Sequence, residues 1–411
     1  MNKKYTDLLQ SNFFRYLSIS SQSLASNTTL PSSEGQRKLA ELLVKELKNL
    51  GLSDICIDEY AIVTAVLKGD KSQAPKIGYI AHLDTVDVNL SPDISPQIIN
   101  FKGEALVLNK EKNIILDPKN HPELNKYKNE NIIFSDGTSV LGADNKAAIS
   151  IIMTSLYYLI DNKISHGDLY VAFVPDEEIG LRGAKKLELS RFPVDFAYTI
   201  DCCEIGEVVF ENFNAGSVNI QIQGVAAHPM SAKGVLINPL LIAVDIINKF
   251  DRKETPECTE NKEGYIWQTD LVSNSTNAIL NMAIRDFDKT SFEQKKLYIQ
   301  SIIEKTKKQY PKAIIEYTIS DVYSNIADSL TEDKRSLDVI FDCMKELAIP
   351  INVLPMRGGT DGAVLSAKNI PTPNYFTGAH NFHSNFEFLP ITSFEKSLAL
   401  TIAIIQKVST L

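Results

Sequence analysis

The segment 76–88 is the sequence feature that most constrains the fold. Residues 77–81 form a short, almost uninterrupted apolar run, which is typical of a strand buried on both faces of a parallel sheet. His82 and Asp84 follow where this strand should end, and residues two apart on a strand point to the same face. Ligands of open α/β sheets bind at the carboxyl ends of strands, so the pair suits a metal ligand and its orienting carboxylate. In isolation, the His82 and Asp84 pair is better explained as a buried histidine whose hydrogen bonds are satisfied by its neighbour.

Length and composition limit the classes of protein to consider. A chain of 411 residues exceeds one ordinary core and suggests two domains. With 42 basic and 51 acidic residues, the net charge of −9 argues against nucleic acid or an anionic membrane as partner. The five cysteines lack zinc-finger or secreted-disulfide spacing, and no apolar run approaches transmembrane length. We therefore expect a cytoplasmic protein.

The order of the elements predicts a discontinuous α/β domain interrupted by a smaller one. Apolar spacing indicates helices at the N-terminus, the second opened by a Ser33-x-x-Gln36 capping box, and residues 89–130 read as a long excursion with short strands. After Asn212 the pattern becomes alternating, and a β-α-β-β-α-β order follows. We expect a mixed-sheet α/β domain at 1–212 and 322–411, with an inserted α+β, ferredoxin-like domain at 213–321.

Further carboxylates lie at the ends of predicted strands. Glu177 and Glu178 follow a strand at 168–174, Asp201 follows one at 196–200, and Asp144 precedes a helix. Separately, these residues suit a solvated acidic turn or a helix N-cap. Together with two histidines they suit a pair of zinc-like ions bridged by one carboxylate, and ions ~3.5–4 Å apart can act jointly on a carbonyl and a hydroxide.

Seven motifs, in order along nearly the whole chain, carry a family resemblance. They are Ala-His-Leu-Asp-Thr, Leu-Gly-Ala-Asp-Asn-Lys-Ala, Pro-Asp-Glu-Glu-Ile-Gly, Thr-Ile-Asp, Ala-His-Pro-Met-Ser-Ala-Lys-Gly, Arg-Gly-Gly-Thr-Asp-Gly and Asn-Phe-His-Ser-Asn-Phe-Glu. On these motifs the chain resembles the peptidase T family, tripeptide aminopeptidases among the co-catalytic di-zinc exopeptidases. The resemblance implies a zinc-exopeptidase catalytic domain, two Zn²⁺ per subunit, and a lid and dimerisation domain at 213–321 that makes a homodimer. It implies small peptides as partners, with no nucleic acid and no membrane.

The resemblance also assigns the metal ligands. His82 and Asp201 would hold one zinc, Glu178 and His383 the other, and Asp144 would bridge both. On spacing alone His380 could replace His383, and the family motif favours His383. Metal coordination lowers the pKa of bound water towards ~7, giving a metal-bound hydroxide that attacks the N-terminal peptide bond.

Residues beside these ligands receive the catalytic roles. Asp84 would orient His82, and Glu177 would be the general base because one side chain of the pair faces the metals while its neighbour faces the water. The resemblance makes His228, on the inserted domain, a donor to the developing oxyanion, although sequence alone favours a turn histidine.

Three residues are candidates for binding the substrate. Arg357 would clamp the peptide's C-terminal carboxylate, which a planar guanidinium can bind bidentately, although a surface arginine is the usual case. Asn281 and Lys233 are weaker candidates for the same task.

The sequence departs from the family pattern at a few positions, and two other functions are compatible with it. Asn145 and Ala148 replace a common Asp and Gly, and Cys202 and Cys203 replace small glycines beside Asp201, which predicts sensitivity to soft metals or thiol oxidants. The nearest rival is an exopeptidase or deacylase of the same clan acting on dipeptides or N-acyl amino acids. A non-catalytic peptide-binding protein is the alternative from another class.

Overall fold

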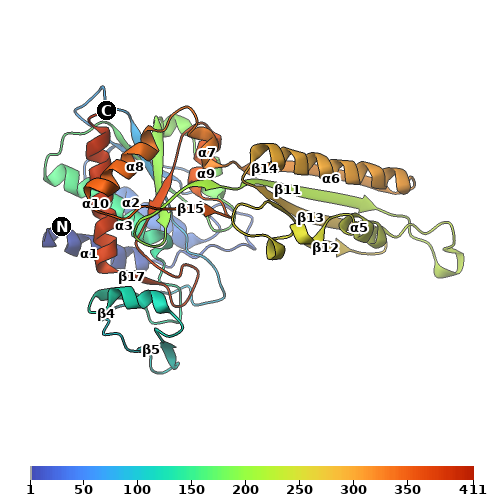
Figure 1. The fold of residues 1–411 in the computed structure, drawn as a ribbon, viewed down its shortest axis with the longest axis horizontal. Coiled ribbons are helices and arrows are strands. Elements are labelled where there is room, and N and C mark those ends of the chain that lie inside the picture. The colour runs from blue at the N-terminus through green and yellow to red at the C-terminus, as the bar shows by residue number, and fades with distance from the viewer. Residues whose placement is uncertain (1) are drawn as a thin grey trace. The chain divides into compact units, whose positions relative to one another are not determined.

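The computed structural model describes residues 2–411, which form two compact units. The first runs through Phe210 and returns as Ser329–Leu354 and Thr360–Leu411, while the second comprises Glu211–Asp328 and Pro355–Gly359. Figure 1 shows the chain coloured along its sequence, so that both passages of the first unit can be followed. Each unit has its own sheet.

The first unit is built on an eight-stranded mixed sheet in the order β1-β2-β8-β3-β9-β16-β10-β15. Its strands are β1 (Ser53–Ile57), β2 (Val63–Leu67), β3 (Ile77–His82), β8 (Leu169–Val174), β9 (Phe196–Cys202), β10 (Glu207–Asn212), β15 (Asn352–Met356) and β16 (Asn374–Phe376). The central neighbours β8, β3, β9 and β16 are parallel, whereas β1, β2 and β10 pair antiparallel. This confirms the predicted mixed sheet and the buried strand that ends in His82.

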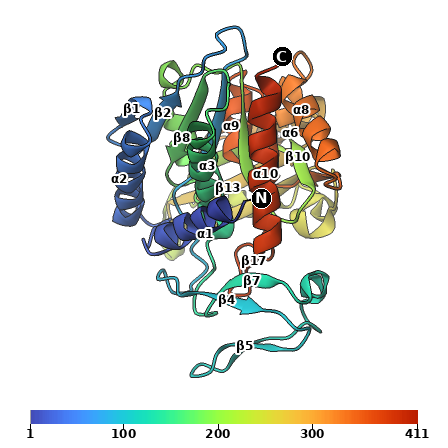
Figure 2. The same cartoon turned by 90° about the vertical axis from the view of Figure 1, so that its left-hand side faces the viewer.

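Helices cover the sheet, so the central strands need no polar face. Every residue of β2, β3 and β8 is buried. Figure 2 shows α3 and α10 on the near side of the sheet. The helices of this unit are α1 (Lys3–Leu17), α2 (Glu34–Asn49), α3 (Ala143–Asp161), α4 (Arg182–Lys186), α8 (Arg335–Glu346), α9 (Asp361–Ala367) and α10 (Ile391–Val408).

The predicted capping box at the start of α2 is wrong in its hydrogen bonds, although the helix begins where expected. Ser33 is the N-cap residue, but its side chain makes no capping hydrogen bond. Gln36 instead donates to Asp176 Oδ1 over 2.6 Å and accepts from the backbone N–H of Asp176 over 2.9 Å. Asp176, which is distant in sequence, therefore occupies the Gln36 side-chain amide that a capping box would use at the start of α2.

The predicted excursion contains a small substructure. Strands β4 (Pro96–Asn100), β7 (Asn131–Ser135) and β17 (Phe388–Pro390) form a three-stranded sheet in the order β17-β7-β4, and β5 (Leu106–Asn109) pairs with β6 (Ile114–Leu116). A 3₁₀ turn, η1 (Pro122–Tyr127), lies between them in sequence. The buried residues of this substructure include Phe101, Leu116 and Phe388, so the substructure has a hydrophobic core of its own.

The second unit has the predicted ferredoxin-like order. Its antiparallel sheet, β12-β13-β11-β14, is formed by β11 (Asn214–Gln223), β12 (Tyr265–Ser273), β13 (Asn277–Asp286) and β14 (Ile314–Tyr323). The helices α5 (Pro239–Ile247) and α6 (Lys289–Gln309) complete β-α-β-β-α-β. Their apolar faces and one face of the sheet make one core that includes Ile220, Leu280 and Ile303.

Helix α5 begins at Pro239. Asn238 caps it by accepting a hydrogen bond from the backbone N–H of Leu240 over 3.1 Å, and Pro239 occupies the first helical position. The role of 213–321 as a lid and dimerisation domain stays a prediction.

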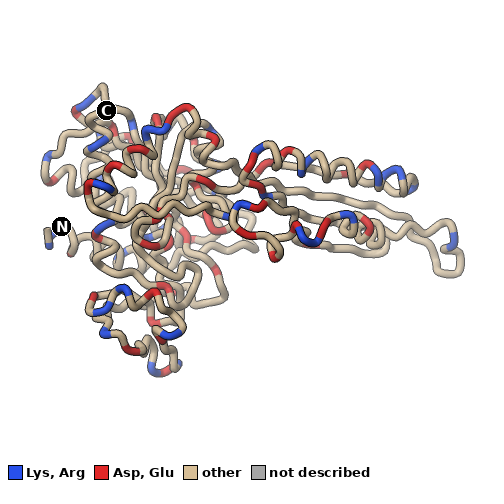
Figure 3. The backbone as a smooth tube through the Cα atoms, viewed as in Figure 1, with Lys and Arg blue, Asp and Glu red and all other residues tan. Residues whose placement is uncertain are grey.

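Charge is spread over both units. Figure 3 shows acidic and basic residues interspersed along the chain. No helix within residues 2–411 is both long enough and apolar enough to cross a membrane.

Candidate metal centre

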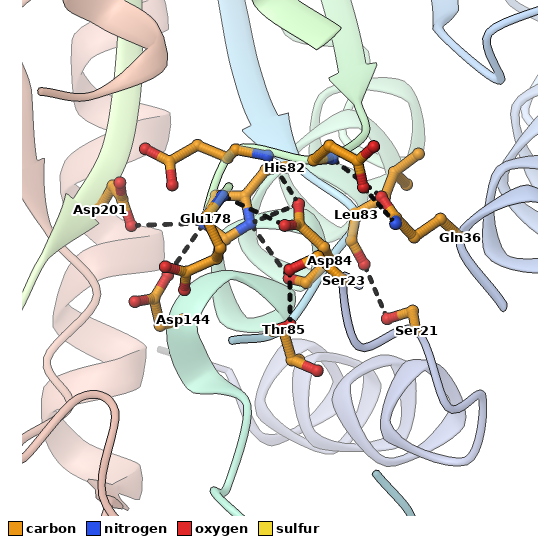
Figure 4. A network of polar contacts seen from close by, with 12 residues as sticks. Ser21, Ser23, Gln36, His82, Leu83, Asp84, Thr85, Asp144, Glu178 and Asp201 are labelled. Atoms are coloured by element: carbon orange, nitrogen blue, oxygen red, sulfur yellow. Dashed lines mark hydrogen bonds and ion pairs between the residues drawn. The ribbon is translucent and has the colours of Figure 1, made fainter. Parts of the chain in front are cut away.

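The carboxyl ends of the parallel strands bring the predicted ligands to one edge of the sheet. His82 is the last residue of β3, and Asp201 is the penultimate residue of β9. Glu178 lies in the turn after β8, and His383 lies in the loop after β16. Because β8, β3, β9 and β16 run parallel, all four segments emerge on the same side. Figure 4 shows the side chains of His82, Asp144, Glu178 and Asp201 turned towards one another.

Asp144 reaches the cluster from a turn that precedes the regular part of α3. Its backbone is not helical, with φ −82° and ψ 96°, and Gly142 before it has φ 75°. A Cβ at Gly142 would lie 3.0 Å from Ile94 Cδ1 and 3.1 Å from Thr85 Cγ2, so glycine suits both the conformation and the space. This turn directs the Asp144 carboxylate out of the helix and into the cluster.

Asp144 lies between the two imidazoles and contacts each with a different oxygen. Its Oδ1 is 2.9 Å from His82 Nε2, and its Oδ2 is 3.1 Å from His383 Nε2. His383 Nε2 is also 3.0 Å from Glu178 Oε1, and His82 Nε2 is 3.9 Å from Asp201 Oδ1. The cluster therefore consists of two groups, each with one imidazole and one carboxylate, that share Asp144.

The donor set fits a divalent cation. One ligand atom from each of His82, Asp144 and Glu178 lies within 4.8 Å of the other two. Glu178 Oε1 is buried, and its polar neighbour is His383 Nε2, 3.0 Å away. A buried carboxylate costs free energy unless a cation or proton balances its charge, and nitrogen and carboxylate ligands are those zinc uses.

The pKa shifts of the imidazoles reflect the surrounding negative charge. Burial opposes a charge on His82, yet hydrogen bonds to Asp144 and Asp84 raise its pKa well above the ordinary value. Hydrogen bonds to Asp144 and Glu178 raise the pKa of His383 to about 10. Both rings lie where a cation would neutralise the carboxylates, and without metal His383 holds a proton at neutral pH.

The pKa values of the carboxylates shift in opposite directions, according to the partners of each carboxylate. Burial opposes a charge on Asp144, but the hydrogen bonds from His383 and His82 hold its pKa well below the ordinary value. Burial and the charge of Asp144 raise the pKa of Glu178 to about 7 and that of Asp201 well above its usual range. Burial likewise raises the pKa of Glu177. Three carboxyls close together without a cation cannot all ionise readily.

Asp84 holds two parts of the cluster. His82 Nδ1 lies 3.0 Å from the Asp84 carbonyl oxygen and 3.3 Å from its Oδ1. The Asp84 carboxylate also accepts hydrogen bonds from the backbone N–H groups of Glu177, over 3.0 Å, and Glu178, over 3.2 Å. It therefore orients the imidazole and fixes the turn after β8.

The three consecutive carboxylates after β8 do not form a solvated turn. Asp176, with φ 56°, is fully buried and points away from the cluster. Its carboxylate accepts from the Ser32 backbone N–H over 2.9 Å, from Ser32 Oγ over 2.5 Å and from Gln36 Nε2 over 2.6 Å. These bonds anchor the first residue of the turn, which leaves Glu177 and Glu178 at the cluster.

Glu387, which sequence reasoning treated only as the end of a motif, joins two segments that supply ligands. Its buried carboxylate accepts hydrogen bonds from the backbone N–H groups of Gly142 and Ala143, both over 2.8 Å, and of Asp144, over 3.2 Å. Because Glu387 closes the loop that carries His383, this contact ties that loop to the Asp144 turn. In the sequence, the signal for this residue is its position four residues after His383 in the family motif.

His380, the alternative to His383, does not reach the cluster. Its Nε2 lies 2.7 Å from the hydroxyl of Tyr127, and its ring stacks on Phe388 with the centroids 4.7 Å apart. Burial lowers the pKa of His380 to about 4. It therefore packs the His383 loop against the excursion as a neutral ring.

Two further buried charged groups near the cluster were not predicted. Asp361, the first residue of α9, is buried, and its Oδ1 has no hydrogen-bond partner among residues 2–411. Lys146 is fully buried, and its Nζ donates to the carbonyl oxygen of Ile19 over 2.7 Å. Burial lowers the pKa of Lys146 to about 7. Both residues lie within the motifs quoted above, but sequence alone does not show that they are buried.

The other predicted site residues belong to the second unit. His228 and Lys233 are exposed, and His228 Nδ1 accepts from the backbone N–H of Met230 over 3.2 Å. Asn281 Oδ1 accepts from Asn219 Nδ2 over 2.8 Å. Within this unit these side chains do not form a cluster like that of the first unit.

Arg357 is held by its own unit. Its guanidinium donates to the carbonyl oxygens of Asn261, over 3.1 Å, and Glu263, over 3.2 Å, and to Thr259 Oγ1, over 2.8 Å. It also lies 5.1 Å from the ring centroid of Phe213. These contacts use three of its five N–H groups.

The cysteines beside Asp201 are poorly placed to react. Cys202 is buried, and burial raises the pKa of Cys202 well above its usual range. Burial and the nearby Glu207 raise the pKa of Cys203 as well. Because the thiolate is the reactive form, the structure argues against the predicted sensitivity to oxidants.

Comparison with known proteins agrees with this geometry. A peptidase T-like protein of Yersinia pestis is 61% identical over 396 residues, 96% of either chain. Peptidase T of Caldanaerobacter subterraneus is 42% identical over 397 residues, covering 96% of this chain and 97% of that protein.

Solved structures share the fold. A tripeptidase from Staphylococcus aureus superposes with a TM-score of 0.74 at 21% identity and covers 99% of both chains. The YXEP protein of Bacillus subtilis, a dinuclear metal-binding peptidase, superposes with a TM-score of 0.63 at 14% identity and covers 98% of this chain and 99% of its own. At these identities the two superpositions establish the fold alone.

The sequence matches decide the family. Residues 141–407 match the model of peptidase family M20/M25/M40, and this segment contains four of the five predicted ligands. The resemblance to peptidase T predicted from the motifs is confirmed by relatives that share 42% to 61% of their residues with this chain. The chain is a metallopeptidase of the peptidase family M20/M25/M40.

Proposed function

We propose that this protein is a di-zinc aminopeptidase that releases the N-terminal residue of tripeptides. The single observation that carries the proposal is the position of Asp144, which contacts one imidazole with each oxygen as a bridging carboxylate would. The relative named peptidase T and the structural neighbour described as a tripeptidase support the substrate class. The neighbour described as dinuclear supports a pair of ions.

In this proposal the two groups of the cluster would become the two metal sites. His82 and Asp201 would hold one zinc, Glu178 and His383 would hold the other, and Asp144 would belong to both. When bound, the ions lower the pKa of water and polarise the scissile carbonyl. Asp84 keeps His82 in the tautomer that offers Nε2, because Nδ1 faces the Asp84 carbonyl and carboxylate oxygens.

Glu177 is the proposed general base. Its backbone N–H is fixed by Asp84 next to ligand Glu178, and burial raises the pKa of its carboxyl. A carboxylate of raised pKa is a stronger base for the attacking water. Glu177 then passes the proton to the amine that leaves when the peptide bond breaks.

The second unit supplies the remaining proposed roles. His228 donates to the developing oxyanion, and Arg357, with Asn281 and Lys233 as lesser candidates, binds the peptide's C-terminal carboxylate. We further propose a homodimer formed through 213–321 and a cytoplasmic location, on the sequence grounds given above.

A peptide panel combined with metal analysis tests the function. Zinc-loaded protein should contain two ions per chain and should turn over free tripeptides faster than dipeptides or N-acyl amino acids. Fastest turnover of a dipeptide or an acylated amino acid would assign the chain to another exopeptidase or deacylase. Tripeptide binding without hydrolysis would indicate a binding protein.

Mixing two inactive variants tests the dimer and His228. In a C₂ dimer in which His228 serves the partner's site, His228→Ala and Glu177→Ala chains, mixed after unfolding and reassembled, restore roughly a quarter of the sites. If His228 serves its own chain, no site regains both residues. Absence of recovery, with heterodimers demonstrated independently, would exclude action in the partner.

A further inference from the structure

Asp361 is a buried carboxylate that no proposed role uses. It opens α9, after Thr360, whose Oγ1 caps the helix by accepting from the backbone N–H of Gly362 over 2.9 Å. The side chain is 3% exposed, and its Oδ1 has no hydrogen-bond partner among residues 2–411. A carboxylate oxygen that is buried and unpaired is costly, so its presence calls for a partner that the chain itself does not provide.

Packing of α9 on β3 and β9 brings Asp361 to the strands that carry His82 and Asp201. Burial and the charges of Asp84 and Glu178, opposed by His82, raise the pKa of Asp361 to about 7. Conversely, the charge of Asp361 contributes to the raised pKa of Glu177.

Asp361 Oδ1 differs from three other buried carboxylates, which have polar partners within the chain. Asp84 and Glu387 accept backbone N–H groups, and Asp144 contacts both imidazoles. Two divalent ions would bring four positive charges to a site with seven carboxylates, so negative charge remains; these carboxylates belong to Asp84, Asp144, Glu177, Glu178, Asp201, Asp361 and Glu387. A site with this excess favours a ligand that brings a cation.

The chemistry of the substrate supplies such a cation next to the reacting atoms. In a peptide, the α-amino nitrogen is two bonds from the first carbonyl carbon, so the group that binds the ammonium has to lie close to the group that activates the attacking water. An N-acyl substrate has no such cation. We propose that Asp361 binds the α-ammonium group of the peptide and thereby restricts hydrolysis to substrates with a free N-terminus, an inference that rests on the proposed aminopeptidase function.

The test compares two ligands that differ only in the amine. Trialanine carries the α-ammonium group, and propionyl-dialanine lacks it. Their dissociation constants are measured by calorimetry with the full-length, zinc-loaded Glu177→Gln protein, which binds without turnover. Loss of a hydrogen bond to a charged group weakens binding by about 10- to 100-fold. Adding Asp361→Asn should therefore raise the dissociation constant of trialanine by about 10- to 100-fold and change that of propionyl-dialanine by no more than about twofold.

Controls separate this role from folding. Asp338→Asn, an exposed carboxylate of α8 in the same unit, should change neither constant. Asp361→Glu, which keeps the charge, should retain part of the preference for trialanine. If Asp361→Asn does not fold, Asp361→Ser is compared with the same two ligands, after its zinc content has been checked.

Two outcomes overturn the proposal. Equal weakening of both ligands would make Asp361 a structural residue, and no weakening of trialanine would place the ammonium elsewhere. The proposed function fails separately, if the unmutated zinc-loaded protein does not hydrolyse trialanine.

Discussion

The two units present their candidate residues in contrasting ways. In the first, His82, Asp144 and their neighbours are gathered at the edge of a sheet whose strands are buried on both faces, and their contacts are 2.9 to 3.1 Å long. In the second, His228 and Lys233 are exposed and Arg357 is engaged by a loop of its own unit. The candidate residues of the first unit are therefore preorganised, whereas those of the second unit form no comparable cluster within residues 211–328 and 355–359. Variants of the first unit should therefore have the larger effects.

Removal of the shared carboxylate should have the largest effect. Asp144→Ala removes the contact of both imidazoles, so both metal sites should empty and turnover should fall to background. The measurement is metal content per chain after dialysis, with the exposed Asp338→Asn as control. Two tightly retained ions would show that Asp144 is not the bridge.

Replacement of the proposed base should separate metal binding from chemistry. Glu177→Gln keeps the shape of the side chain and removes its ability to accept a proton, so both ions should stay while kcat falls by about 10²- to 10⁴-fold. Steady-state kinetics with metal analysis on the same sample checks this. A variant that lost its ions as well would make Glu177 a ligand.

Arg357 tests whether the second unit has a site of its own. If its guanidinium binds the peptide's carboxylate, C-terminal amidation should lower kcat/KM by about 10- to 100-fold in the unmutated protein and have no effect in Arg357→Ala. Equal sensitivity of both proteins to amidation would leave the arginine with only its structural contacts to Thr259, Asn261 and Glu263.

Glu387 tests how far the preorganisation depends on residues that touch no metal. Glu387→Gln weakens the acceptor for the N–H groups of residues 142–144, so zinc affinity should fall by about 10- to 100-fold, as expected for residues that position a ligand. Competition with a zinc chelator measures this loss. Unchanged zinc affinity would show that Glu387 caps the start of α3 without positioning a ligand.

The dependence of stability on pH should be the smallest effect and should differ between metal-free and metal-loaded protein. Hydrogen bonds to Asp144 and Glu178 raise the pKa of His383 to about 10, above its unfolded value of ~6.5. A raised pKa stabilises the fold fully below the unfolded value and loses that contribution as pH rises through the folded one. The Tm of metal-free protein should therefore fall between pH 7 and 10.

Metal-loaded protein should show much less of this fall, because the cations replace the proton on His383. The two curves are compared by calorimetry in the same buffers, with metal-free His383→Ala as the control for the imidazole. A metal-free Tm that did not change over this range would contradict the protonated pair.

Local patterns in the sequence were sufficient for much of the fold. The apolar run at 77–81, the alternation in β11 and the β-α-β-β-α-β order are periodicities of two or 3.6 residues, which a strand or a helix imposes on neighbouring positions. The ends of strands β3 and β8 followed from the same patterns, whereas β9 extends to Cys202, beyond its predicted end at residue 200. The spacing of strand ends therefore predicted which residues could meet.

Only the tertiary structure decided how side chains without a local pattern are used. It directs His383 to the cluster and His380 to Tyr127, and it turns Asp176 inwards to Ser32. It also buries Asp361 on α9, which packs on β3 and β9. The physical reason is that the free energy of a buried charge depends on its surroundings in space, which come from segments distant in the sequence, such as Glu387 and Gly142, 245 residues apart.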